Sequence, residues 1–140
     1  MTGTKDKPVI KVADFGLAKA YEISGQYGFT RTKGGTMGTP YFMSRQQIKD
    51  FKYSKQDVDV WAAAATYYFM LTGDVPKEFT GKKDIWVEAF TQDAVPVLKR
   101  NSRIPKKLAE VIDAALMDRI ETGIGVKTAV ELKKMIEKAL

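Results

Sequence analysis

The chain has 140 residues, of which 44% are hydrophobic and 29% charged, and this composition fits one soluble globular domain. It contains no cysteine and no histidine, which excludes disulfides, thiol nucleophiles, cysteine-ligated zinc, histidine bases and a Ser-His-Asp triad. The net charge of +6 comes from lysines scattered in ones and twos among acidic residues, so the pattern favours a solvated basic surface and predicts no nucleic-acid partner.

The first eight residues have no apolar core, so they do not resemble a signal peptide. The strongest apolar run is residues 60–71, VWAAAATYYFML, far shorter than the roughly 20 residues that a membrane span needs. We therefore expect no membrane insertion and a helix that is buried on all sides. The absence of cysteine fits a cytoplasmic protein.

The chain begins with one predicted strand and one long loop. Residues 9–13, VIKVA, are short and rich in β-branched side chains, which is typical of a strand. Residues 20–40 contain repeated glycines and threonines without a sustained period. A loop of this length in a compact domain usually carries function.

Five helices are expected after the loop. Ser44 is placed to cap a short first helix, and Ser54 to cap the apolar helix, which Gly73 ends. Asp84 is placed to cap a third helix with the sequence IWVEAF.

The last two predicted helices are amphipathic. Pro105 opens the first of them, in which apolar side chains recur at helical spacing from Leu108 to Leu116. The final helix begins at Thr128, with Glu131 three residues later as a capping box. The predicted fold is thus mainly α, with one short strand and one long loop.

Several short motifs follow one another in a recognisable order. They are Asp14-Phe15-Gly16, then Gly38-Thr39-Pro40-Tyr41, then Asp59-Val60-Trp61 ahead of Leu71-Thr72-Gly73, then Ile104-Pro105, then Thr128-Ala129-Val130-Glu131-Leu132. In this order and spacing the chain resembles the C-terminal lobe of a bacterial serine/threonine protein kinase of the eukaryotic-like type. The resemblance covers nearly the whole chain from about residue 8. It implies that residues 1–140 are a partial kinase domain, with an activation segment at about 14–46 and a helical subdomain at about 47–140.

The resemblance assigns the Asp-Phe-Gly turn to cofactor binding. Phosphoryl transfer depends on positioning and on neutralising charge on the phosphate oxygens, so a carboxylate has to hold Mg²⁺ beside ATP. Asp14 matches that metal ligand, Phe15 the side chain that packs inward, and Gly16 the residue that lets the loop turn. A chance Asp-Phe-Gly turn is the alternative interpretation.

Four further residues receive roles from the resemblance. Thr30 and Thr32 match the paired threonines that such kinases phosphorylate, although Thr36 or Ser24 could serve instead. Thr39 matches the threonine that aligns the substrate hydroxyl. Asp59 matches a buried acid that anchors the catalytic loop, and its alternative role is to stabilise the positive end of a helix.

The sequence also departs from the family's pattern. Where kinases commonly have Ala-Pro-Glu, this chain has Ser44-Arg45-Gln46, and the position of the arginine that pairs with that glutamate matches Gly125. Losing both partners of a buried ion pair is less harmful than losing one. The joint loss suggests a divergent but coherent subfamily.

Only thirteen residues precede Asp14, too few for the Gly-rich loop, the lysine and glutamate pair, and the catalytic loop of a kinase. We therefore expect the isolated chain to be inactive and to bind ATP and Mg²⁺ weakly. Its expected partners are the N-lobe, the catalytic loop and, in the intact enzyme, protein substrates. The alternative is a non-catalytic helical interaction module, which self-association or domain swapping through exposed apolar surface would reveal.

Overall fold

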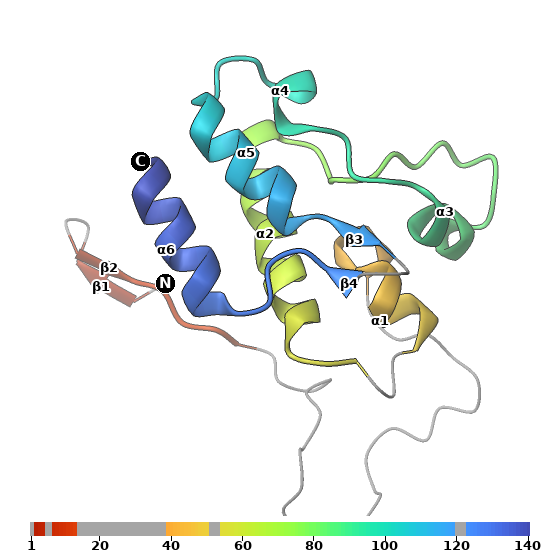
Figure 1. Ribbon diagram of the computed structural model, residues 1–140, viewed down its shortest axis with the longest axis horizontal. Helices are drawn as coiled ribbons and strands as arrows, with labels where there is room; N and C mark the ends of the chain where they lie inside the picture. Colours follow the sequence, from red (N-terminus) through yellow and green to blue (C-terminus); the bar gives the residue numbers. More distant parts are fainter. Residues whose placement is uncertain (1, 5–6, 14–38, 51–53, 120–122) are drawn as a thin grey trace, which may run out of the picture. The chain divides into compact units, whose positions relative to one another are not determined.

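A computed structural model of the chain describes residues 2–4, 7–13, 39–50, 54–119 and 123–140 (Figure 1). These residues belong to two compact units, Met1–Gly38 and Thr39–Leu140. The described part of the chain is mainly helical, which confirms the predicted fold class.

The first unit contains a small antiparallel hairpin. Strand β1 (Thr2–Thr4) pairs with β2 (Lys7–Val9), and the register sets Thr2 opposite Val9. The predicted strand at residues 9–13 is therefore wrong apart from Val9. Val9 pairs with Thr2, which is the first described residue of β1, so residues 10–13 have no described residue of β1 to pair with. The β-branched side chains of Ile10 and Val12 stay exposed.

The described residues of the second unit form six helices, one 3-10 helix and a two-stranded sheet. In chain order these are η2 (Pro40–Phe42), α1 (Arg45–Lys49), α2 (Asp57–Thr72), α3 (Ile85–Thr91), α4 (Val97–Arg100), α5 (Lys106–Ala115), β3 (Asp118–Arg119), β4 (Gly123–Ile124) and α6 (Ala129–Ala139). Strands β3 and β4 pair antiparallel. The sequence pattern predicts five of these six helices but neither α4 nor the small sheet.

Local capping determines where three of the helices begin, as predicted. The side chain of Ser44 accepts a hydrogen bond from the backbone N–H of Gln47 at 3.2 Å, which starts α1. Asp84 and Thr128 cap α3 and α6 in the same way. A side-chain acceptor satisfies one of the backbone N–H groups that a helix start leaves unpaired.

The helix α2 begins differently from the prediction and ends as predicted. Its first residue is Asp57, after Gln56, whose side chain makes no capping bond. Ser54 instead donates its hydroxyl hydrogen to the carbonyl of Asp50 at 3.1 Å, so its predicted capping role is wrong. Gly73 ends the helix with a φ of +79°, a left-handed conformation that glycine adopts at little cost.

The core of the second unit lies between α2, α5 and α6, which run side by side in Figure 1. Trp61 and Tyr68 of α2 and Ile112 of α5 are fully buried, and Leu132 of α6 is nearly so. The indole N–H of Trp61 donates to the carbonyl of Leu116 at 2.9 Å. Each large apolar side chain buried in this way contributes on the order of 1.5–3 kcal/mol, so these helices position everything else.

The prediction that α2 is buried on all sides is wrong. Tyr67, Phe69 and Met70 are 42%, 46% and 65% exposed, because the described segments cover only part of the helix circumference. Within the described ranges no helix has the length and apolarity to cross a membrane.

Candidate substrate-positioning site

Two of the seven predicted site residues lie in the described part of the chain. Those outside it are the cofactor-binding turn, with its predicted metal ligand, and the predicted phosphorylation sites: Asp14, Phe15, Gly16, Thr30 and Thr32. Among the described residues, no three acidic side chains gather into a cluster that could hold a metal ion. The chemistry of the described site therefore rests on Thr39, Asp59 and the groups around them.

Residues 39–46, here called the anchor segment, start at an exposed threonine and pass through the protein interior at Met43 and Ser44. Thr39 is exposed and precedes η2, and its side chain makes no capping bond. Its carbonyl accepts the N–H of Phe42 at 3.2 Å, which fixes the backbone. Met43 and Ser44 are 5% and 0% exposed. The segment thus presents the Thr39 hydroxyl at the surface from a backbone that is attached to the core.

Arg45 attaches the anchor segment to two other parts of the chain. Its backbone N–H donates to Oδ2 of Asp118 in β3 at 2.7 Å, and its guanidinium lies 3.4 Å from Oδ1 of the same side chain. The guanidinium also donates to the carbonyl of Phe90 at 2.6 Å and to Oδ1 of Asp93 at 2.7 Å. A planar guanidinium with five donors suits such a junction.

The Arg45–Asp118 pair is largely removed from water. The two side chains are 12% and 3% exposed, whereas that of Asp93 is 89% exposed. A buried pair of this kind adds little net stability, but losing one partner is expensive because it leaves the other charge uncompensated. In the sequence Arg45 stands out only as a departure from the family pattern, and no residue near Asp118 indicates the role of that carboxylate.

The backbone at Gly125, the position that matches the family's arginine, leaves no room for a side chain. A Cβ atom on Gly125 would lie 2.5 Å from the carbonyl oxygen of Ala114, so no side chain fits there without a backbone shift. Gln46 still reaches the same turn, because its amide oxygen lies 3.7 Å from the Cβ position of Gly123. The Arg45–Asp118 pair, one residue before Gln46, supplies a buried ionic link at this place.

Asp59 lies in the first turn of α2 and is exposed. The acid that is buried in this turn is Asp57, which is 9% exposed and pairs with Lys127 at 3.8 Å. Both carboxylates lie at the positive end of the helix, as the alternative interpretation of Asp59 expected. The anchoring role of Asp59 stays a prediction, since nothing among the described residues tests it.

A second carboxylate, Glu88, orders the loop that supports the anchor segment. It is 2% exposed and accepts hydrogen bonds from the hydroxyl and the backbone N–H of Thr80 and from the N–H of Gly81. The Thr80 hydroxyl bond holds the pKa of Glu88 below its usual value. The neighbouring Phe79 ring meets the edge of Tyr41 with centroids 4.6 Å apart, so the ordered loop packs against η2.

Comparisons with known proteins agree with the order of the motifs. Residues 2–137 match the family described as protein kinase domain. A probable serine/threonine-protein kinase of Clostridium perfringens is 29% identical over 111 residues, which cover 79% of this chain and 16% of that protein. The probable serine/threonine-protein kinase nek2 of Dictyostelium discoideum is 40% identical over 76 residues, or 54% of this chain and 16% of that protein.

A kinase named for a different acceptor also matches. The receptor-like tyrosine-protein kinase kin-15 of Caenorhabditis elegans is 27% identical over 89 residues, which cover 63% of this chain and 18% of that protein. The chain thus spans less than a fifth of the length of each of these relatives. No solved structure matches it.

Proposed function

The chain belongs to the protein kinase domain family, and from this we propose that it forms the C-terminal lobe of a bacterial serine/threonine kinase of the eukaryotic-like type. Intact kinases use ATP and Mg²⁺, and this one transfers the γ-phosphate to serine or threonine side chains of proteins. We expect the 140-residue chain by itself not to catalyse the transfer, because we identify no phosphate-binding loop and no catalytic loop among its residues.

The observation that carries the proposal is the anchor segment. Its backbone is attached to α3 and β3 through Arg45, while the Thr39 hydroxyl remains exposed one residue before the buried Pro40. Phosphoryl transfer gains most from holding the acceptor hydroxyl in place, so a rigid segment that ends in an exposed hydroxyl is what the reaction needs. We assign Thr39 to aligning the acceptor and Asp14 to holding Mg²⁺.

The test uses a longer protein in which a kinase N-lobe and catalytic loop are joined in frame ahead of the chain. Phosphate transfer from radiolabelled ATP to myelin basic protein and to the enzyme itself is measured with Mg²⁺ present. We expect Asp14→Asn to lower the rate by about 100-fold or more, since it removes a group that neutralises transition-state charge. We expect Thr39→Ala to lower it by about 10- to 100-fold and Thr39→Ser to retain most of it.

The matched control is Thr66→Ala. Thr66 is an exposed threonine of α2 whose hydroxyl bonds only to the carbonyl of its own helix at Ala62, 2.9 Å away. Its loss should leave the rate within about twofold. Phosphotyrosine as the main product would refute the serine/threonine assignment, and an Asp14→Asn variant with full activity would refute the role of Asp14.

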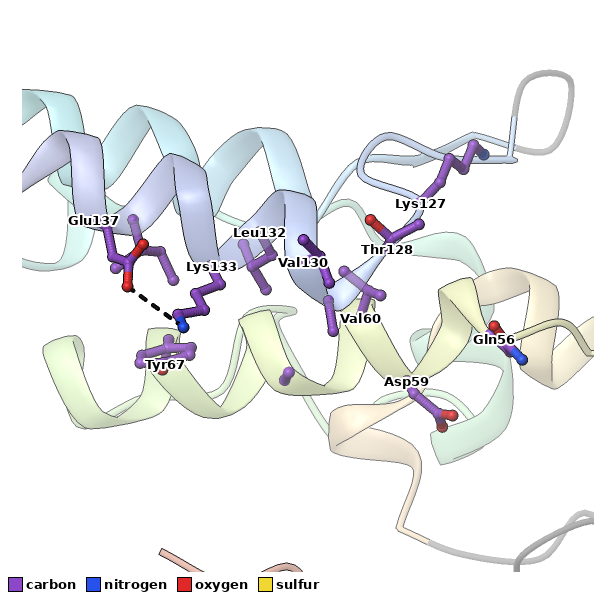
Figure 2. A pocket seen from close by; sticks show the side chains of 13 residues that line it. Gln56, Asp59, Val60, Tyr67, Lys127, Thr128, Val130, Leu132, Lys133 and Glu137 are labelled. Carbon is purple, nitrogen blue, oxygen red and sulfur yellow. Dashed lines mark ion pairs between the residues drawn. The ribbon is translucent and has the colours of Figure 1, made fainter. Parts of the chain in front are cut away.

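A second candidate function, the non-catalytic interaction module, is supported by a groove between α2 and α6. The groove has a volume of about 910 Å³, and Lys133 of α6 extends toward Tyr67 of α2 across it (Figure 2). Apolar lining residues include Val60, Ala63 and Ile136. Apolar surface of this kind is a common site of protein association.

Light scattering of the 140-residue chain separates the two candidates. The module predicts a dimer whose fraction rises with concentration and falls in Tyr67→Lys, while Val87→Lys, at a 45% exposed position of α3, leaves it unchanged. A monomer at every concentration, together with phosphate transfer by the longer protein, would refute the interaction module and support the kinase.

A further inference from the structure

Lys77 is a buried cation that the motifs do not account for. It follows Pro76 in the loop after α2, and its side chain is 0% exposed. Lysine is almost never fully buried unless it is paired, because taking an ammonium out of water is costly. Its burial here therefore calls for specific partners.

Three oxygen atoms surround the Nζ atom of Lys77. The carbonyl of Ala89 accepts a hydrogen bond at 2.7 Å, Oδ2 of Asp118 at 3.4 Å and the carbonyl of Met43 at 3.5 Å. The ring of Trp61 lies 5.0 Å away, within cation–π distance. Three acceptors match the three donors of a charged ammonium, whereas a neutral amine has only two.

These acceptors come from segments that are far apart in the sequence. Met43 belongs to the anchor segment, Ala89 to α3 and Asp118 to β3. Asp118 is also the partner of Arg45, so a buried lysine and a largely buried arginine share one buried carboxylate. Lys77 thus contacts the anchor segment directly, through the carbonyl of Met43, and indirectly, through Asp118, which also binds Arg45.

We propose that Lys77 is a positioning residue that fixes the backbone of the anchor segment, and with it the Thr39 hydroxyl. The part of this inference that concerns substrate rests on the proposed function. A hydrophobic side chain would fill the same space at no electrostatic cost, so stability alone does not explain a buried lysine. Directed hydrogen bonds to Met43 and Asp118 give what an apolar side chain does not, a defined place for the carbonyl at the end of η2.

Amide hydrogen exchange of the 140-residue chain, followed by NMR, tests the proposal with Lys77→Met. The informative amides are those of Phe42 and Met43, which donate to the carbonyls of Thr39 and Pro40 within η2. We expect both to exchange at least about tenfold faster in the variant, after correction for any change in global unfolding. The Leu116 amide at the end of α5 serves as the core reference and should keep its corrected rate.

The matched control is Lys82→Met, an exposed lysine in the same loop, which should leave both η2 amides unchanged. A uniform acceleration at η2 and Leu116 would show that Lys77 has only a structural role, and no acceleration at η2 would likewise overturn the proposal.

A measurement on the unchanged chain keeps the proposal testable if Lys77→Met does not fold. We expect the side-chain ammonium of Lys77 to give a slowly exchanging ¹⁵N signal at pH 6, coupled to the carbonyl carbons of Ala89 and Met43. Rapid exchange with water would overturn the proposal. Neither measurement requires ATP or phosphate transfer, so failure of the kinase assay and failure of this inference are distinguishable.

Discussion

Replacing Asp118 by asparagine removes the carboxylate that the buried Lys77 shares with the largely buried Arg45. The side chain keeps its size but loses its charge. Because both carboxylate oxygens accept hydrogen bonds from Arg45 or Lys77, the amide N–H₂ group of asparagine has to face at least one of these donors. In the folded chain Asp118 is 3% exposed and accepts from the backbone N–H of Arg45 at 2.7 Å, from the guanidinium at 3.4 Å and from Lys77 at 3.4 Å.

The expected cost follows from the burial of Lys77. Arg45 retains the exposed Asp93 at 2.7 Å, but Lys77 retains only carbonyl acceptors. Breaking a buried pair by removing one partner costs about 3–5 kcal/mol. This is a large part of the roughly 5–15 kcal/mol that stabilises a typical domain.

Urea unfolding followed by circular dichroism measures this cost on the 140-residue chain. With a slope of about 2 kcal/mol per molar urea, a loss of 4 kcal/mol lowers the midpoint by about 2 M. The control is Glu137→Gln, which breaks the exposed i,i+4 pair with Lys133 at 3.7 Å and should change the unfolding free energy by less than about 0.5 kcal/mol.

The double variant Lys77→Met with Asp118→Asn tests the cause. Because it removes the uncompensated charge, it should be more stable than Asp118→Asn alone. A single variant that loses less than about 1 kcal/mol, or a double variant that is less stable than the single one, would refute the electrostatic reasoning.

Two further predictions follow from the geometry of single residues. Gly125→Ala places a Cβ atom 2.5 Å from a backbone carbonyl, whereas the Cβ atom of Gly73→Ala meets open space and adds only the strain of a left-handed φ, about 1 kcal/mol. Urea unfolding should therefore show a larger loss of unfolding free energy for Gly125→Ala than for Gly73→Ala. Equal losses would contradict the close contact at Gly125. Because the folded pKa of Glu88 is depressed, its stabilisation is complete above its unfolded pKa of about 4.3 and is lost as the pH falls through the folded value. Urea midpoints should therefore fall less below pH 4.3 in Glu88→Gln than in the unchanged chain, and parallel curves would refute this.

The sequence predicted those features that depend on neighbouring residues. A serine or threonine side chain that caps a helix acts within three residues, so Ser44 and Thr128 could be assigned from their spacing alone. Gly73 ended α2 as expected because a left-handed turn depends on local backbone sterics. The order of the motifs likewise predicted a kinase lobe, and the family match confirmed a protein kinase domain.

Other features depended on contacts between distant segments. Ser54 had the right residue type for a cap, yet its hydroxyl bonds to the carbonyl of Asp50 instead. The apolar run of α2 predicted burial on all sides, but what covers a helix is decided by the segments packed around it, and Phe69 and Met70 remain exposed.

The polar junction beneath the anchor segment was the feature least visible in the sequence. Arg45, Lys77 and Asp118 are separated by up to 73 positions, and each is an ordinary surface residue by type. Only the packing of α3 and β3 against the anchor segment removes them from water and brings their charges together. The sequence by itself thus determined five of the six described helices and the protein kinase family, because these follow from local physics and motif order. The tertiary structure decided which charges are buried, because desolvation depends on the whole fold.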